Sequence, residues 1–102
     1  MLSISRFREV DEELAAGLRM VAEVWRSRPG CLGVDLVVNL DEPSLWALVS
    51  RWSDVGSYRR ALSGNETKLR LTPVLLRAMD EPSAYLDPGE LIGGDDPWLR
   101  GS

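Results

Sequence analysis

The chain has 102 residues, of which 44% are hydrophobic and 27% are charged, as expected for one compact folded domain and not for a disordered chain. Twelve basic and sixteen acidic residues give a net charge of −4, and since six of the acids follow Met79, the rest of the chain is nearly neutral. We therefore expect neither nucleic acid nor a membrane as a partner. The absence of histidine excludes an imidazole base and a histidine-bound metal or haem, and the single cysteine, Cys31, excludes an internal disulfide or a thiolate cluster.

The N-terminal part of the sequence contains a strand pattern followed by a helix pattern. Residues 1–8 alternate loosely between apolar and polar side chains, which is typical of a strand. Asp11 stands where an N-cap belongs, and the apolar residues after it recur at helical spacing: Leu14, Leu18, Val21, Ala22 and Trp25. Pro29-Gly30 cannot continue this helix, so the helix is predicted to end just before it.

A hairpin is predicted next. Every second residue from Leu32 to Leu40 is apolar, residues 41–44 have turn chemistry, and residues 45–52 predict a second, antiparallel strand. One face of that second strand carries Trp46, Leu48, Ser50 and Trp52, and the other carries Leu45, Ala47, Val49 and Arg51. Both faces of the strand are therefore mainly apolar.

Two short helical segments are predicted after the hairpin. Ser53 or Asp54 can cap a helix over residues 55–62. Residues 66–79 predict a helical turn, a break, and a new helix with Thr72 as its cap and Pro73 at its first position. A strand over residues 74–78 is the alternative for this segment.

The end of the chain predicts one more strand and a tail. Residues 83–86 read as the last strand of a domain that spans residues 1–87. Residues 88–102 form an acidic, glycine-rich tail, in which we expect Leu91 and Ile92 to touch a partner subunit.

The predicted order of strand, helix, two strands, helices and strand gives an α+β fold, a ferredoxin-like split βαβ arrangement with an antiparallel sheet. Its helices would cover one face of the sheet and leave the other face bare. Because both faces of the 45–52 strand are apolar, the bare face needs a cover, and a second copy of the protein is the simplest one. We therefore expect a homodimer.

Several stretches together resemble the antibiotic biosynthesis monooxygenase family of dimeric α+β barrels. They are Pro29-Gly30-Cys31-Leu32 at the start of a strand, the hairpin, residues 51–59 with a tryptophan followed six residues later by a tyrosine, and residues 80–85. The resemblance covers residues 1 to about 87 and implies a dimer whose sheets form a barrel. In characterised branches, a pocket between sheet and helices oxidises aromatic polyketide phenols to quinones with dioxygen and no cofactor.

The resemblance also implies site residues. Trp52 matches the family's tryptophan at the strand end and Tyr58 its helix tyrosine, so these two are the candidate catalytic residues. Leu48 and Ser50 share the strand face of Trp52, and Arg70 lies near the position of an active-site arginine, which makes these three the candidate substrate-binding residues. Leu48 stands where the quinone-forming members have an asparagine. Another branch degrades haem with a histidine ligand, which this chain lacks, so haem degradation is not expected.

Each candidate also has a purely structural explanation. Trp52 can be a core tryptophan with its N–H bonded locally, the Tyr58 hydroxyl can lie in water, and Arg70 can be a solvated surface cation. The sequence therefore leaves two functions open. One is a cofactor-independent monooxygenase acting on a small aromatic phenol, and the other is a non-catalytic dimeric module that binds a small ligand or serves in an assembly.

The remaining expectations concern cofactors and location. No phosphate-binding or dinucleotide-binding loop stands at a strand-to-helix turn, so we expect the purified protein to contain no metal, flavin or haem. Neither a basic leader with an apolar core nor a long apolar run is present, and cysteine is scarce, so we expect a cytoplasmic protein.

Overall fold

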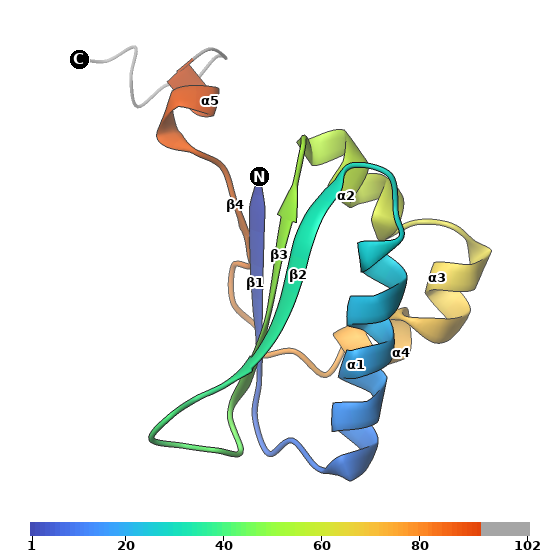
Figure 1. Ribbon diagram of the computed structural model, residues 1–102, viewed down its shortest axis with the longest axis vertical. Coiled ribbons are helices and arrows are strands. Elements are labelled where there is room, and N and C mark those ends of the chain that lie inside the picture. Colours follow the sequence, from blue (N-terminus) through green and yellow to red (C-terminus); the bar gives the residue numbers. More distant parts are fainter. Residues whose placement is uncertain (93–102) are drawn as a thin grey trace.

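The computed structural model of the protein describes residues 1–92, with side chains described up to residue 90. It contains four strands and five helices within that range (Figure 1). Their bounds are β1 (Leu2–Phe7), α1 (Glu12–Arg26), β2 (Cys31–Val38), β3 (Trp46–Trp52), α2 (Val55–Ala61), α3 (Asn65–Arg70), α4 (Thr72–Leu75), β4 (Ala84–Tyr85) and α5 (Pro88–Ile92).

The four strands form one antiparallel sheet in the order β2-β3-β1-β4. The hairpin β2–β3 pairs along its whole length, and β3 pairs with β1 on its other side, so β3 and β1 are the central strands. This topology confirms the predicted α+β, ferredoxin-like fold with an antiparallel sheet. The predicted last strand is also present, although it is shorter than expected.

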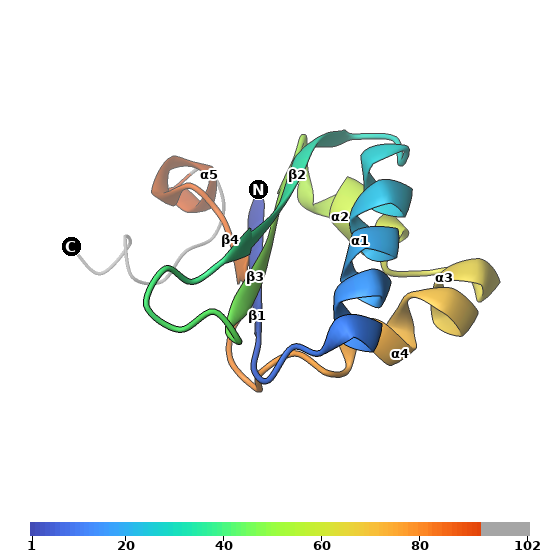
Figure 2. The ribbon, with the colours of Figure 1, turned by 60° about the horizontal axis from the view of Figure 1, so that its bottom comes forward.

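Helices α1 to α4 all lie on one side of the sheet, where α1 and α2 contact the strands (Figure 2). We call the face on this side the helix face. The core lies between that face and α1, whose buried residues follow the predicted apolar stripe. The opposite face, which we call the open face, is not covered by α1 to α4 (Figure 2). From β1 and β3 it receives Leu2, Ile4, Ala47 and Val49, all partly exposed. The same face also carries the charged residues Arg6, Asp35 and Arg51. The sheet therefore has a face with an apolar central part that α1 to α4 do not cover.

Strand β1 turns its polar residues inward. Ser3 is buried on the helix face beside Ser50, and Phe7 is buried there beside Trp46, while Leu2 and Ile4 lie on the open face. The apolar alternation alone favours the opposite placement, because apolar residues usually face the core. The hydroxyl groups of the two serines are hydrogen-bonded to each other, which offsets the free-energy cost of burying them.

Helix α1 begins and ends as predicted. The carboxylate of Asp11 accepts a hydrogen bond from the Leu14 amide over 2.8 Å, which caps the N-terminus. The helix ends at Arg26, and Gly30 then takes φ +84°, a left-handed conformation that favours glycine. The chain can therefore turn sharply into β2.

Residues 65–75 form helix, break and helix, so the alternative of a strand over residues 74–78 is wrong. The prediction of Thr72 as the cap is also wrong. Thr72 is already the first residue of α4, and the cap position is Leu71, which makes no capping bond through its side chain. Leu71 is buried in the core, so packing rather than a polar cap fixes the start of α4.

The alternation predicted for β2 breaks at both ends. Leu32 is 69% exposed and Leu40 93% exposed, so neither belongs to the buried face with Val34. At the first end the pairing with β3 shifts between Cys31 and Gly33, a β-bulge that leaves Leu32 as an extra residue. At the other end the strand stops at Val38, before Leu40 is reached.

The predicted tail begins with a short helix. Residues 88–92 form α5, and the Asp87 carboxylate accepts a hydrogen bond from the Gly89 amide over 2.8 Å. The expected contact of Leu91 and Ile92 with a partner subunit concerns side chains outside the described residues, as does the rest of the tail. Within residues 1–92 no helix combines the length and the apolar character needed to cross a membrane.

Candidate functional site

The candidate residues of β3 lie together on the helix face. Leu48, Ser50 and Trp52 alternate along this central strand, and their side chains are 0%, 0% and 1% exposed. Leu48 and Trp52 belong to the buried core cluster that also includes residues of α1 and Ala61 of α2. A ligand can reach them only if a neighbouring element moves.

Three aromatic rings meet at the end of β3. The ring centres of Trp25 and Trp52 are 5.8 Å apart at an interplanar angle of 80°, an edge-to-face contact. The Tyr58 ring is 6.2 Å from that of Trp25 and 5.9 Å from that of Trp52. Helix α1, strand β3 and helix α2 each contribute one ring, so this aromatic cluster joins the three elements.

Buried hydroxyl groups continue from the aromatic cluster across the sheet. The indole Nε1 of Trp52 donates to Ser50 Oγ over 2.7 Å, and Ser50 Oγ is hydrogen-bonded to Ser3 Oγ on the neighbouring strand. Burial raises the pKa of Tyr58, and hydrogen bonding by its hydroxyl to Ser83 and Ser3 acts in the opposite direction. The net effect is a raised pKa, so the phenol keeps its proton to a higher pH than a fully exposed tyrosine does.

One polar atom of the aromatic cluster has no partner. The indole Nε1 of Trp25 is buried and has no hydrogen-bond acceptor among the described residues. A buried donor of this kind costs free energy when it stays unbonded. Among the described residues this N–H is thus a buried donor without an acceptor, close to the rings of Trp52 and Tyr58.

Arg70 is not brought together with the other candidates. It lies on α3 with an exposed side chain, and its Nη1 forms an ion pair with Glu66 Oε1 over 2.9 Å, one helical turn away. The structure therefore groups Leu48, Ser50, Trp52 and Tyr58 and leaves Arg70 on the surface.

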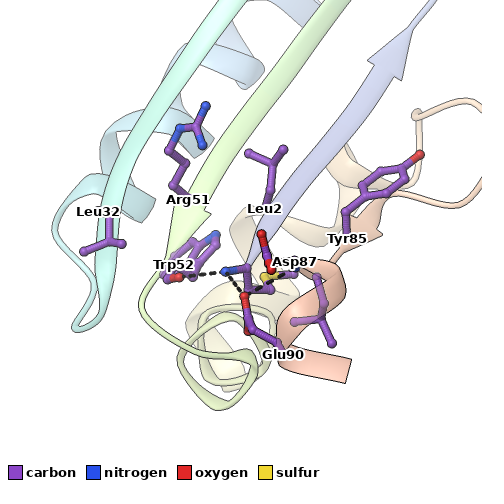
Figure 3. Close-up of a pocket in the computed structure, with 9 residues that line it drawn as sticks. Leu2, Leu32, Arg51, Trp52, Tyr85, Asp87 and Glu90 are labelled. Atoms are coloured by element: carbon purple, nitrogen blue, oxygen red, sulfur yellow. Dashed lines mark hydrogen bonds and ion pairs between the residues drawn. The ribbon is translucent and has the colours of Figure 1, made fainter. Parts of the chain in front are cut away.

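A separate hollow of about 340 Å³ opens at the end of the sheet beside α5 (Figure 3). Its wall includes Leu2 and Tyr85 of the open face, together with Arg51, Asp87 and Glu90. The α-ammonium group of Met1 lies 3.2 Å from the Trp52 carbonyl oxygen, to which it donates, and 3.8 Å from Glu90 Oε1. Trp52 therefore borders this hollow while its ring is buried in the core.

Three residues of the site were missed by the sequence reasoning. The sequence pattern places Trp25 in the apolar stripe of its helix and places Ser3 and Ser83 in strands, but it assigns none of the three to a site. The helical spacing that predicted burial of Trp25 did contain a signal, because a buried tryptophan needs a partner for its N–H. Nothing in the sequence pairs Ser3 with Ser50, since that contact depends on the register of β1 against β3.

The described part of the chain offers no ready metal site. No group of three or more histidine, cysteine, aspartate or glutamate side chains converges within it. The arrangement is instead an apolar, aromatic region with a few hydroxyl and N–H groups, which suits a neutral or weakly acidic aromatic molecule.

Comparison with known proteins places this geometry in context. The family model described as antibiotic biosynthesis monooxygenase matches residues 4–68. No significant match was found among curated protein sequences.

Solved structures show the same fold at low sequence identity. SnoaB from Streptomyces nogalater, described as a cofactor-independent oxygenase, has a TM-score of 0.65 and 20% identity over 76% of this chain and 80% of its own. Rv0793 from Mycobacterium tuberculosis has a TM-score of 0.66 and 20% identity over 84% and 94%. A conserved protein from Methanosarcina mazei has a TM-score of 0.64 and 17% identity over 81% and 84%.

Proposed function

The chain belongs to the antibiotic biosynthesis monooxygenase family, and from that premise we propose that it is a cofactor-independent monooxygenase that oxidises an aromatic, polyketide-like phenol with dioxygen. The observation that carries the proposal is the unpartnered Trp25 Nε1 in the aromatic cluster with Trp52 and Tyr58. Most buried donors in folded proteins are hydrogen-bonded, so the unbonded Trp25 N–H supports a role in binding an acceptor atom of a ligand.

The proposed reaction requires few functional groups from the protein. An anthrone, or the phenol that is its enol tautomer, can lose a proton, and the resulting anion can itself transfer an electron to dioxygen. The ring CH₂ of the anthrone, or the ring C–H of the phenol, then becomes C=O. One oxygen atom enters the product and the other leaves as water, so no further reductant is consumed. The protein has to bind the anion, keep water out and stabilise the charge on its oxygen.

The side chains of the site divide these tasks. The Tyr58 hydroxyl and the Trp25 N–H are donors for the substrate oxygen, whereas the Trp52 N–H is already bonded to Ser50. The chain has no histidine to serve as an imidazole base. The substrate should therefore be a phenol or anthrone acidic enough to ionise without one.

Access to the site requires a moving wall, and α2 is the element that we propose moves. Only Ser57 and Ala61 of this seven-residue helix are buried, while Tyr58 is half-buried. A short helix with so few buried residues opens at low free-energy cost. Its displacement would uncover Trp25 and Trp52 together.

We also propose that the protein is a homodimer assembled through the open face. The apolar side chains of that face include Val37 and Tyr85, which are 45% and 48% exposed. Packing two such faces would form the barrel implied by the family. The cytoplasmic location expected from the sequence stays a prediction.

Oxygen uptake with a panel of anthrones and naphthols tests the proposed activity. We expect wild-type protein to accelerate uptake, and Tyr58→Phe to lower kcat by about tenfold or more, since it removes a donor to developing charge. Tyr85→Phe is the matched control, because it makes the same change at a tyrosine on the open face and should leave kcat unchanged.

Two results would contradict the proposal. Uptake by wild-type protein at the uncatalysed rate for the whole panel would favour the ligand-binding module instead, which quenching of tryptophan fluorescence by the same compounds would then detect. Equal kcat values for wild type and Tyr58→Phe would remove Tyr58 from the site.

A further inference from the structure

A second polar site lies where the turn after α1 meets α2. Arg28, Ser57 and Arg60 line a hollow of about 130 Å³, completed by Pro29 and Ala61. Since water occupies about 30 Å³ in the liquid, the hollow has room for roughly four waters or one small anion. No carboxylate belongs to its lining.

The two arginines present unused hydrogen-bonding capacity. Arg28 Nε is buried and has no acceptor among the described residues, which costs free energy unless an acceptor arrives. Arg60 Nη2 donates to Ser57 Oγ over 3.2 Å, so its guanidinium is held at the hollow. Two guanidinium groups at one small hollow match the geometry and charge of an oxyanion.

The backbone holds Arg28 in place before any ligand binds. The Arg28 amide donates to the Trp25 carbonyl over 3.0 Å, and its own carbonyl accepts from the Cys31 amide over 3.2 Å. Gly30 brings the turn so close to α2 that a Cβ there would collide with Ser57 Oγ. The turn and α2 are thus packed directly on one another when α2 is in its closed position.

The helix N-terminus is not the source of this site. The Ser57 amide already donates to the Asp54 carboxylate over 2.6 Å. Asp54 is the nearby acid. Hydrogen bonding from Ser57 is the main cause that lowers its pKa, and the charge of Arg60 adds to it, so the Asp54 carboxylate offsets part of the arginine charge without lining the hollow. The arginine pair keeps a net positive charge.

We propose that Arg28, Arg60 and Ser57 form a binding site for a doubly charged oxyanion of the phosphate type. The anion is either free inorganic phosphate or the terminal phosphoryl group of a larger molecule whose remainder stays outside the hollow. This site is separate from the aromatic cluster and does not depend on oxygenase activity.

Calorimetric titration at fixed ionic strength in chloride buffer tests the site, with inorganic phosphate and phenyl phosphate as the probes. We expect saturable binding of phosphate by the wild-type protein. Arg28→Gln and Arg60→Gln should each weaken it by about tenfold or more, the effect of losing one charge-assisted hydrogen bond. Arg59→Gln removes the same charge from a neighbouring residue outside the hollow and should bind as the wild type does.

The two probes distinguish the sources of the anion. Binding of phosphate alone indicates a free anion, and equal or tighter binding of phenyl phosphate indicates a phosphoryl group on a larger ligand. Absence of binding heat for both probes would overturn the proposal, as would unchanged affinity in Arg60→Gln. Because Arg60 is exposed, that variant is expected to fold even if Arg28→Gln does not.

Discussion

Trp52 is a core residue whose ring also lies next to the two side chains that we propose bind the substrate, Trp25 and Tyr58. Its ring is buried and its N–H is bonded to Ser50, so its hydrogen-bonding capacity is used within the sheet. The polar task in the proposed reaction therefore falls to its neighbours Trp25 and Tyr58. Replacing Trp52 would disturb both neighbours, because its ring packs against each of them.

The Tyr58 phenol predicts a pH dependence of folding. Burial raises its pKa above the usual value of about 10, so the unfolded chain loses this proton at lower pH than the folded chain does. The contribution of the protonated Tyr58 to the free energy of unfolding is fully present below about pH 10, and it is lost as the pH rises past that value. Chemical denaturation between about pH 8 and 11 should show a smaller decline for Tyr58→Phe than for wild type.

The control for this experiment is the other tyrosine. Tyr85→Phe should keep the part of the decline that Tyr58→Phe removes, because it leaves the Tyr58 hydroxyl in the aromatic cluster. Parallel curves for wild type and Tyr58→Phe would show that the Tyr58 hydroxyl is not held in a buried environment.

At the scale of elements, strand β3 was the most informative part of the sequence. Its alternation correctly separated Leu48, Ser50 and Trp52 from Val49 and Arg51. Helix α1 was equally clear, because both its cap and its apolar stripe are local features. Residues within one element can be placed from sequence since a helix or strand fixes their directions.

What could not be predicted depends on contacts between elements. The bulge that displaces Leu32 arises from pairing of β2 with β3, and Ser3 is buried because β1 brings it beside Ser50. Arg70 could not be placed, because the orientation of α3 relative to the sheet is not a local feature of its sequence. Its ion pair with Glu66 is local, yet no sequence signal says which side of α3 faces the site.

The cap of α2 predicts how easily the aromatic cluster is uncovered. Asp54→Ala removes the acceptor for the Ser57 amide, so amide hydrogen exchange across Val55–Ala61 should accelerate. Asp11→Ala removes the equivalent cap of α1 and should instead lower the global free energy of unfolding by about 1 kcal/mol. Exchange measured by mass spectrometry distinguishes the two effects.

A selective gain in exchange within α2 would support its role as the moving wall. If Asp54→Ala raised exchange equally in α1, β3 and α2, the helix would not open as a separate unit and another route to Trp25 would be needed.

At the scale of the whole molecule, the open face predicts the oligomeric state. Light scattering at micromolar concentration should give the mass of a dimer, whose interface would bury on the order of 2,000 Å² or more. Val49 lies between Ile4 and Asp35 at the centre of the sheet, so Val49→Asp would place a charge in the middle of that interface and should yield monomers.

Leu69→Asp is the matched control for the dimer. Leu69 is also apolar and is 78% exposed, but it lies on α3, on the other side of the sheet. This variant should remain dimeric. A monomeric mass for the wild-type protein would remove the dimer from the proposal, and a dimeric Val49→Asp would move the interface elsewhere.

The edge-to-face contact of Trp25 and Trp52 gives the protein an optical signature. The two indole rings are 5.8 Å apart and inclined by 80°. We expect their electronic transitions to couple and to give paired positive and negative bands in the circular dichroism spectrum. Any ligand that separates the rings would cancel this pair of bands while leaving the helical signal intact. Entry of a colourless compound could therefore be followed spectroscopically without labelling the protein and without waiting for turnover.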